Sequence, residues 1–332
     1  MNIEQRSIRR KWGITLFPIL VIAVSAFGLI YGSVPITLVD IWSVLTGSGE
    51  SIHETIILQL RLPRVLIGLL VGACLGVSGA ILQGVMKNPL ADPGIIGVTA
   101  GGGVAATITM LVLPQFGYLL PITAFIGALV TAIFIYLLAW DRGASAFKII
   151  LAGVAINALL GAVQSGLMVI FSDRVQSVLP WLAGGLNGRS WYHLSFMAPY
   201  AIVGLLLSLL AIKPANLLLL GDDSAKLLGE RVEWQRFLLI VLAALLAGTA
   251  VSVAGLIGFV GLVVPHIIRL IFGEDYRFLL PLSALGGAVL VVFADTLART
   301  LFDPIELPVG ILLACLGAPF FLYLLKKRGM MV

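Results

Sequence analysis

The chain has 332 residues, of which 60% are hydrophobic and only 11% are charged, and its formal net charge is +5. An ordinary soluble domain carries about 25% charged residues, so water cannot be the solvent for most of this surface. The composition excludes a typical water-soluble protein and predicts one that lies in a lipid bilayer. We therefore do not read the net positive charge as a sign of nucleic-acid binding, and no nucleic-acid partner is expected.

The apolar runs predict membrane-spanning helices. They are roughly 18–25 residues long and do not alternate with the period of two that a membrane barrel requires. Helices are expected because backbone groups in hydrocarbon must be hydrogen-bonded internally. Ten windows have suitable composition, and they cover 13–32, 62–83, 93–113, 118–139, 148–171, 192–212, 236–255, 257–271, 278–300 and 306–325. We predict an all-α polytopic protein in which residues 1–332 form a single transmembrane domain.

Two windows need comment. The first follows Arg6, Arg9, Arg10 and Lys11, and its apolar stretch exceeds the ~7–15 residues of a signal peptide, so an uncleaved first span is expected. The stretch 237–273 is predicted to form two tightly joined spans, although only Gly255 and Gly258 mark a turn within it.

The distribution of Lys and Arg predicts the orientation. Ten spans place both termini on one side, and 16 of the 21 basic residues fall on that side. Cytoplasmic loops carry the excess of positive charge, so both termini are predicted to be cytoplasmic. Two five-helix halves would then be inverted relative to each other, as in many transporters, although the sequence shows no convincing repeat. The five outer basic residues are Arg61, Arg64, Arg174, Arg189 and Arg299.

Several kinds of machinery are missing from the sequence. Asp92, Asp295 and His266 lie near the ends of predicted spans, whereas an ion-coupled secondary carrier needs such groups near the bilayer midplane. There is no phosphate-binding loop, dinucleotide fingerprint or metal-ligand spacing. Without a nucleophile and base, a membrane-embedded enzyme is also disfavoured. Cys74 and Cys315 are interpreted as packing residues. Energy for uphill transport would have to come from another subunit.

The longest predicted cytoplasmic interruption is the loop 213–235. Its acidic start at Asp222 predicts a short helix that carries Leu227 and Leu228, and Gly229 would end it. A solvated connector between two spans is one interpretation. The other is a docking element that offers a small apolar knob, surrounded by charge, to a cytoplasmic partner.

Two features lie at or near the outer side. Arg61 and Arg64 are three residues apart and share one helical face, and Arg299 ends another span on the same side. These arginines could anchor the spans at the interface, with Arg299 neutralised by Asp295, or they could bind an acidic partner. A ridge of glycines is interpreted as a close helix-packing surface; its members are Gly68, Gly72, Gly76 and Gly79.

Several motifs resemble one known family. The matching segments run through the whole chain in order, from about residue 12 to residue 328; they are Arg61-Leu62-Pro63-Arg64, Gln83 with Asn88-Pro89-Leu90-Ala91-Asp92-Pro93-Gly94, Leu151-Ala152-Gly153-Val154, Gly258 through Arg269, and Glu306-Leu307-Pro308-Val309-Gly310. Together they resemble the FecCD family of importer permeases, whose members carry iron–siderophores, haem and cobalamin.

The resemblance implies an assembly: two permease subunits of ten helices each, two cytoplasmic ATPase subunits and an external substrate-binding protein. ATP and Mg²⁺ would be bound by the ATPases, and this chain would bind no cofactor or metal and would not itself be an enzyme. The second permease subunit would be a homologue or a copy of this chain, and a heterodimer is favoured. The pathway would run along the helices 148–171 and 306–325.

The resemblance also implies roles for individual residues. Arg61, Arg64 and Arg299 would pair with glutamates of the binding protein, so that Glu in place of Arg61 and Arg64 would weaken docking without unfolding the chain. Asn88 and Leu90 match a cytoplasmic gate, whose second element falls at Ala146 and Phe147, where cobalamin relatives carry small hydroxyl residues. The coupling helix that contacts the ATPase would comprise Asp222, Asp223, Ser224, Ala225, Lys226, Leu227, Leu228, Gly229 and Glu230.

The resulting functional hypothesis is a multi-pass permease subunit in a bacterial cytoplasmic membrane, importing an iron(III)–siderophore by alternating access. Cobalamin or haem import within the same family is the alternative, and an ion-coupled carrier is the alternative of another class.

Overall fold

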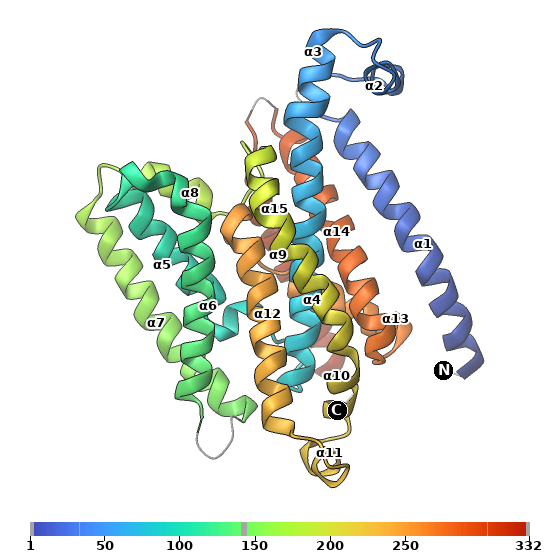
Figure 1. Cartoon of the computed structure of the whole chain (residues 1–332), viewed down its shortest axis with the longest axis vertical. Helices are drawn as coiled ribbons and strands as arrows, with labels where there is room; N and C mark the ends of the chain where they lie inside the picture. Colours follow the sequence, from blue (N-terminus) through green and yellow to red (C-terminus); the bar gives the residue numbers. More distant parts are fainter. Residues whose placement is uncertain (1–2, 33, 141–144, 304, 330–332) are drawn as a thin grey trace.

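The computed structural model describes residues 3–32, 34–140, 145–303 and 305–329, and the regular elements within these ranges are all helices (Figure 1). The predicted all-α class is therefore confirmed. Seven helices are long and apolar enough to cross a membrane; they are Trp12–Ile30, Ser51–Val85, Pro114–Leu138, Ala146–Ile170, Trp191–Leu210, Val232–Ala254 and Tyr276–Thr300. Three shorter apolar helices, Val98–Leu111, Val260–Phe272 and Val309–Tyr323, fall in the remaining predicted windows.

The centre of the molecule is built on α4 (Leu62–Val85), which packs against α12 (Val232–Ala254) and α14 (Tyr276–Thr300). The glycine ridge explains how closely α4 and α14 approach. A Cβ on Gly72 would lie 2.1 Å from the Gly287 carbonyl oxygen, and one on Gly76 would lie 2.2 Å from that of Ser283. The packing interpretation of the ridge is confirmed, because only glycine allows these backbones to touch.

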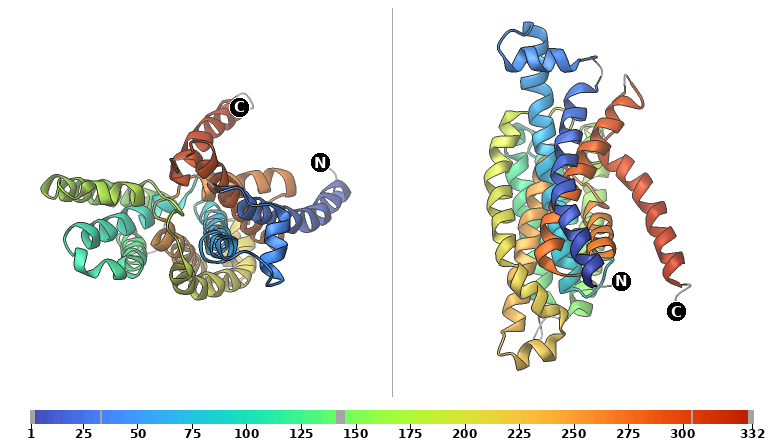
Figure 2. Two further views of the ribbon diagram at one scale, coloured as in Figure 1. Left: turned by 90° about the horizontal axis from the view of Figure 1, so that it is seen from above. Right: turned by 90° about the vertical axis from the view of Figure 1, so that its right-hand side faces the viewer.

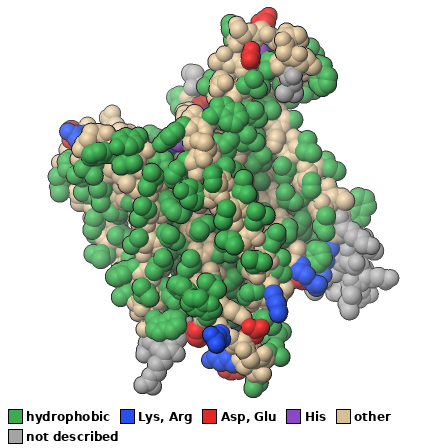
Figure 3. All heavy atoms as spheres, in the orientation of Figure 1, with side chains coloured by type: hydrophobic (Ala, Val, Ile, Leu, Met, Phe, Trp, Pro, Cys, Tyr) green, Lys and Arg blue, Asp and Glu red, His purple; other side chains and the backbone are tan. Residues whose placement is uncertain are grey.

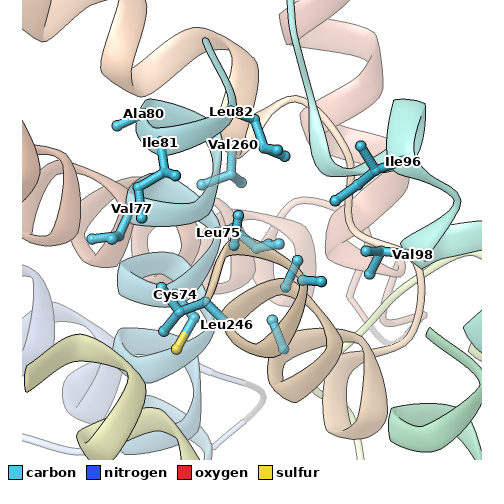
Figure 4. Close-up of a cluster of buried hydrophobic side chains, with 14 of the residues drawn as sticks. Cys74, Leu75, Val77, Ala80, Ile81, Leu82, Ile96, Val98, Leu246 and Val260 are labelled. Carbon is cyan, nitrogen blue, oxygen red and sulfur yellow. The ribbon is translucent and has the colours of Figure 1, made fainter. Parts of the chain in front are cut away.

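Apolar side chains fill the space beside this contact. Leu75 and Leu82 of α4 face Val260 at the start of α13 (Val260–Phe272), with Ile96 and Val98 nearby (Figure 4). The two cysteines form no disulfide, since Cys74 is buried in this cluster and Cys315 is exposed on α15 (Val309–Gly329).

Other helices surround this centre. α5 (Val98–Leu111) and α6 (Leu120–Leu138) pack together on one side of α12, and α9 (Trp191–Leu210) lies against α4 and α12. α1 (Ile3–Ile30) lies along α14. Short connecting elements complete the chain; they are η2 (Pro93–Ile96), η3 (Pro114–Leu119), α8 (Val175–Leu182), α10 (Ile212–Leu219) and α11 (Asp222–Leu227).

Two helices are barely packed. α7 (Ala146–Ile170) buries only Ile149 and Gly153 among its residues, and α15 exposes Ile311, Leu316, Leu322 and Tyr323. Seen from above, α7 and α15 project from the bundle in different directions (Figure 2). Hydrophobic side chains cover the middle of the face in Figure 3, and Lys, Arg, Asp and Glu gather at its lower end. A surface of this kind needs lipid or another apolar chain as its neighbour.

The helix at Arg61 begins earlier than predicted. α3 (Ser51–Glu54) continues through a π-helical stretch, η1 (Thr55–Arg61), into α4 as one rod. With α2 (Leu38–Leu45), this rod projects beyond the rest of the molecule (Figure 1). The predicted start at residue 62 came from the apolar window 62–83, and a proline at residue 63 is typical of a helix that opens there, because proline lacks an N–H. Here the hydrogen bonds of the π-helical stretch reach one residue further back, and the helix passes through the proline.

The predicted break within 237–273 is confirmed. α12 ends at Ala254, and the turn that follows holds Gly255 at φ +70° and Phe259 at φ +67° before α13 begins. The segment after α8 packs on this turn, because the Gly185 N–H donates to the Ala254 carbonyl at 2.8 Å. The start of α15 is tied to the same segment by the Gly310 N–H, which donates to Gly184 at 3.0 Å. These two hydrogen bonds hold the end of α12, the segment after α8 and the start of α15 together.

Candidate functional site

Arg64 is the centre of a buried ion-pair cluster at the N-terminal end of α4. Its Nε and Nη2 donate to the two carboxylate oxygens of Asp295 at 2.8 and 3.0 Å, and its Nη1 donates to Glu306 at 2.8 Å. Arg64 and Asp295 are 8% and 4% exposed. This bidentate arrangement satisfies the charge of the guanidinium within the chain. The cluster ties α4 to α14 and to the segment before α15.

Arg61 and Arg299 donate hydrogen bonds to backbone carbonyls at the end of α1. Arg61 donates to the carbonyls of Leu29, Ile30 and Val34 at 2.6, 2.7 and 2.5 Å, and Arg299 donates to the carbonyl of Gly28. The last carbonyls of a helix have no partner within it and carry partial negative charge. The two guanidinium groups therefore cap α1 and fasten it to α4 and α14.

This placement corrects two expectations. Asp295 pairs with Arg64, and not with Arg299 as the anchoring interpretation had it. The guanidinium groups of Arg61, Arg64 and Arg299 are buried and hydrogen-bonded within the chain, and anchoring of the spans at the membrane interface stays a prediction. Glu in place of Arg61 and Arg64 would bury carboxylates beside carbonyls and Asp295, so that variant would be destabilised. All three residues are buried. Docking of a binding protein through them stays a prediction.

The predicted short helix in the loop 213–235 is present as α11. It carries Leu227, which is 89% exposed, and Leu228 directly follows it at 63% exposed. Gly229 adopts φ +81°, which ends the helix as predicted. The N-cap is Gly221, and no side chain caps the helix, which differs from the expected acidic cap. An apolar knob with Asp223, Ser224 and Lys226 beside it is thus displayed at the lower end of the molecule (Figure 1).

Asp222 connects this helix to two others. Its carboxylate accepts from Lys87 Nζ at 2.8 Å and from Arg236 Nη2 at 2.7 Å. Partial burial alone would raise the pKa of Asp222, but the hydrogen bonds from Lys87 and Arg236 outweigh it and hold the pKa below its usual value. The ion pairs are therefore present at neutral pH, and their contribution is lost only as the pH falls through that lowered pKa.

The segment that carries Asn88 and Leu90 follows Lys87 directly. Lys87 has φ +47°, a strained value for a residue with a side chain. The Asn88 side-chain oxygen accepts from the Leu90 N–H at 2.9 Å, which stabilises a tight turn. The next element, η2, is held by α7, because Asn157 Nδ2 donates to the Gly94 carbonyl at 2.9 Å. Contacts at its two sides thus connect this turn to α11, through Lys87 and Asp222, and to α7, through Gly94 and Asn157.

The second predicted gate element lies at the start of α7. Ser145 caps the helix by accepting from the Lys148 N–H at 3.3 Å, and Phe147 is 70% exposed while Ala146 is partly buried. The two predicted gate elements thus follow the end of α4 and open α7, and no hydrogen bond joins them among the described residues. Their role as a gate stays a prediction.

Sequence reasoning missed three of these residues. In the sequence, Glu306 stands out only as part of a motif, and Lys87 and Arg236 are only two of the 16 basic residues predicted on the cytoplasmic side. Arg236 gave a usable signal, because it opens a predicted span and so had to find partners near the membrane boundary. Among the described residues, no group of three or more His, Cys, Asp or Glu side chains is arranged to hold a metal ion.

Comparison with known proteins agrees with this architecture. The model of the FecCD transport family matches residues 19–327. The chain is 40% identical to the Fe(3+)-citrate import permease YfmE of Bacillus subtilis over 94% of each chain. It is 39% identical to the hemin transport permease HmuU of Yersinia pestis over 96% of each chain. It is 43% identical to the cobalamin import permease BtuC of Halobacterium salinarum over 83% of this chain and 74% of that one.

A solved structure gives the same result at the level of the fold. An inward-facing conformation of a metal-chelate type ABC transporter superimposes with a TM-score of 0.83 and 32% identity, covering 94% of this chain and 97% of the other. Since the family model spans nearly the whole helical domain, the chain belongs to the FecCD transport family.

Proposed function

We propose that this chain is the membrane-spanning permease subunit of an ATP-binding cassette importer that moves an iron(III)–siderophore across a bacterial cytoplasmic membrane. The observation that carries the proposal is the family match over residues 19–327. The relatives named above, which include permeases for ferric citrate, hemin and cobalamin, support a bulky metal chelate as the substrate. The haem and cobalamin substrates are the alternatives to an iron–siderophore.

The proposed topology has ten membrane-spanning helices, two inverted five-helix halves and both termini in the cytoplasm. It is supported by seven helices of spanning length and three shorter apolar ones. The ends of the described chain also point toward the part of the molecule that carries α11 (Figures 1 and 2). With the positive-inside rule, this end is the cytoplasmic one.

The energy would come from two ATPase subunits that bind ATP and Mg²⁺, so the chain itself would not be an enzyme. Their contact would be the coupling helix, where Leu227 offers an apolar knob of the kind that fills a pocket on a partner. The poorly packed faces of α7 and α15 would meet the second permease subunit and line the shared pathway. An extracytoplasmic binding protein would deliver the chelate at the outer end, where docking through Arg61, Arg64 and Arg299 was predicted.

The contacts suggest how ATP hydrolysis would reach the gate. Movement of α11 acts on Asp222, which holds Lys87. Lys87 precedes the Asn88 turn, and that turn leads into η2, which is hydrogen-bonded to α7. In this mechanism the coupling helix, the cytoplasmic turn and a pathway helix move together, and access alternates between the two sides.

The test is uptake of radioactive iron in cells with and without this chain, using hydroxamate, catecholate and citrate chelates, with labelled cobalamin and haem as further lanes. Loss of uptake for one iron chelate supports the proposal and names the ligand class. Loss of only cobalamin or haem uptake would replace the substrate and keep the importer. Co-purification with a phosphate-loop ATPase distinguishes the importer from an ion-coupled carrier.

A further inference from the structure

A polar cavity of about 270 Å³ lies at the outer end of the molecule, among the end of α5, α8 and the segment that leads into α15. Met110, Trp181 and Leu307 supply apolar walls. The polar side chains on its lining are Arg64, Ser177, Asn187, Arg189 and Glu306. Because Gly184 and Gly185 tie α8 to α12 and α15, these walls come from elements that are fastened to one another.

The two arginines in the cavity wall are in different electrostatic situations. Arg64 is compensated by Asp295 and Glu306. Arg189 makes no ion pair with any residue that the structure describes, and its Nε is buried without an acceptor. Burial lowers the pKa of the Arg189 guanidinium, and no carboxylate acts on it in the opposite direction.

An uncompensated guanidinium in such a place needs an explanation. Arg189 is only partly exposed and its Nε is fully buried, and withdrawing a charged group from water without a partner is costly. The backbone nevertheless holds Arg189 in place: the Arg189 N–H donates to the Leu186 carbonyl at 3.2 Å, Gly188 takes φ +70° in that turn, and Ser190 caps α9. The side chain is therefore presented to the cavity by a defined turn and not by a loose loop.

We propose that this cavity is an outer anion site, in which Arg189 binds a carboxylate of the metal chelate as the chelate enters the pathway. Guanidinium is suited to this task because its N–H groups match the two oxygens of a carboxylate. The Asn187 amide, which lines the same cavity, offers further hydrogen-bonding atoms. The Glu306 carboxylate is held by Arg64, so Arg189 is the cation left to a ligand. The inference rests on the proposed function and narrows its substrate to chelates that carry free carboxylates.

The first experiment measures initial uptake of radioactive iron by the complete importer in cells, with ferric citrate and with a neutral hydroxamate chelate. Arg189→Gln is expected to raise KM for ferric citrate about tenfold, since a charge-assisted hydrogen bond is lost, while kcat and the uptake of the hydroxamate stay near wild type. Arg189→Lys keeps the charge and is expected to recover part of the loss. Arg174→Gln is the matched control, because Arg174 is an outer arginine with an exposed side chain beside Asp173.

A second experiment does not depend on transport. Citrate alone is titrated into the purified full-length protein while the fluorescence of Trp181, a wall residue of the cavity, is followed, and Trp181→Phe identifies its share of the signal. The response is expected in the wild type and in Arg174→Gln, and is expected to be lost in Arg189→Gln. Citrate binding without uptake of any chelate would keep the site and overturn the proposed function. Unchanged uptake and citrate binding in Arg189→Gln would overturn the site. So would loss of an acidic partner protein from Arg189→Gln with citrate binding intact.

Discussion

The two ends of α4 are both held by arginine or lysine ion pairs, but the pairs differ in kind. At the N-terminal end, Arg64 is almost fully buried and is satisfied by two carboxylates from distant parts of the chain. Just beyond the C-terminal end, Lys87 has a side chain that is 46% exposed, and its partner Asp222 is 34% exposed. A buried pair cannot be opened without leaving a charge in a poor environment, whereas a half-exposed pair can exchange its partner for water. The Arg64 pairs therefore stabilise the fold, and the Lys87–Asp222 pair is suited to a part that moves.

The largest expected effect is from Arg64→Ala. It would leave Asp295 buried without its partner, and removing one member of a buried pair costs about 3–5 kcal/mol. Thermal unfolding of the purified protein in detergent is the measurement. Arg174→Ala, which removes an arginine with a 49% exposed side chain, is the control and is expected to melt as the wild type does. Equal melting of the two variants would contradict the structural role of the Arg64 cluster.

Gly72→Ala tests the segment between the two ends. The added methyl would meet the Gly287 carbonyl oxygen at 2.1 Å, and overpacking of this kind costs about 1–3 kcal/mol. The free energy of unfolding should fall accordingly. Gly161→Ala on α7 is the matched control, because nothing lies within 4 Å of the new atom; it is expected to be neutral or slightly stabilising. If Gly161→Ala were destabilised and Gly72→Ala were not, the assignment of Gly72 to the packed helix face would be wrong.

Asp222→Asn should change stability by less than about 1 kcal/mol, because the pairs it removes are partly solvated. Its effect on transport should be greater, with uptake several-fold slower at an unchanged amount of protein in the membrane. Asp223→Asn serves as the control, since Asp223 is exposed on the same short helix and forms no ion pair among the described residues. Equal uptake by the two variants would show that Asp222 takes no part in coupling.

The smallest expected effect on stability is from Leu227→Ala. The side chain is 89% exposed, so unfolding should stay within about 0.5 kcal/mol of the wild type. Binding of the ATPase, measured by co-purification, should nevertheless weaken. Leu220→Ala in the same connector, outside α11, provides the comparison. If Leu227→Ala still binds the ATPase as the wild type does, the loop is a solvated connector between two spans and not a docking element.

Much of the fold follows from local patterns in the sequence. The apolar windows, the break at Gly255 and the exposed helix at Asp222 each depend on a signal within about one span of chain, and each was predicted. The partners of Arg61 and Arg64 were not predicted, because they are carbonyls of α1 and the carboxylate of Asp295, which is 231 residues from Arg64. The π-helical entry to α4 was also missed, since nothing in the local pattern around Pro63 distinguishes a helix that starts from one that passes through.

The same distinction between local patterns and tertiary contacts holds for the candidate site. Sequence patterns indicated which segments carry charge at each face, but the partners of those charges come from tertiary packing. Lys87 and Arg236 meet on Asp222 only because three elements converge there. Arg189 could be recognised in the sequence as a rare outer cation, while its lack of a counter-charge is visible only when its neighbours are in place.

The backbone contact between α4 and α14 limits how this protein can move. Where Gly72 and Gly287 touch, neither helix can slide past the other without a carbonyl oxygen entering the space of a neighbouring Cα, so α4 and α14 are expected to move as one rigid unit. A conformational change must then occur in the segments beside this unit, such as the strained turn from Gly255 to Phe259 and the thinly packed α7. A cross-link between α4 and α14 should be tolerated during the transport cycle, whereas a cross-link from this unit to one of those segments should arrest it.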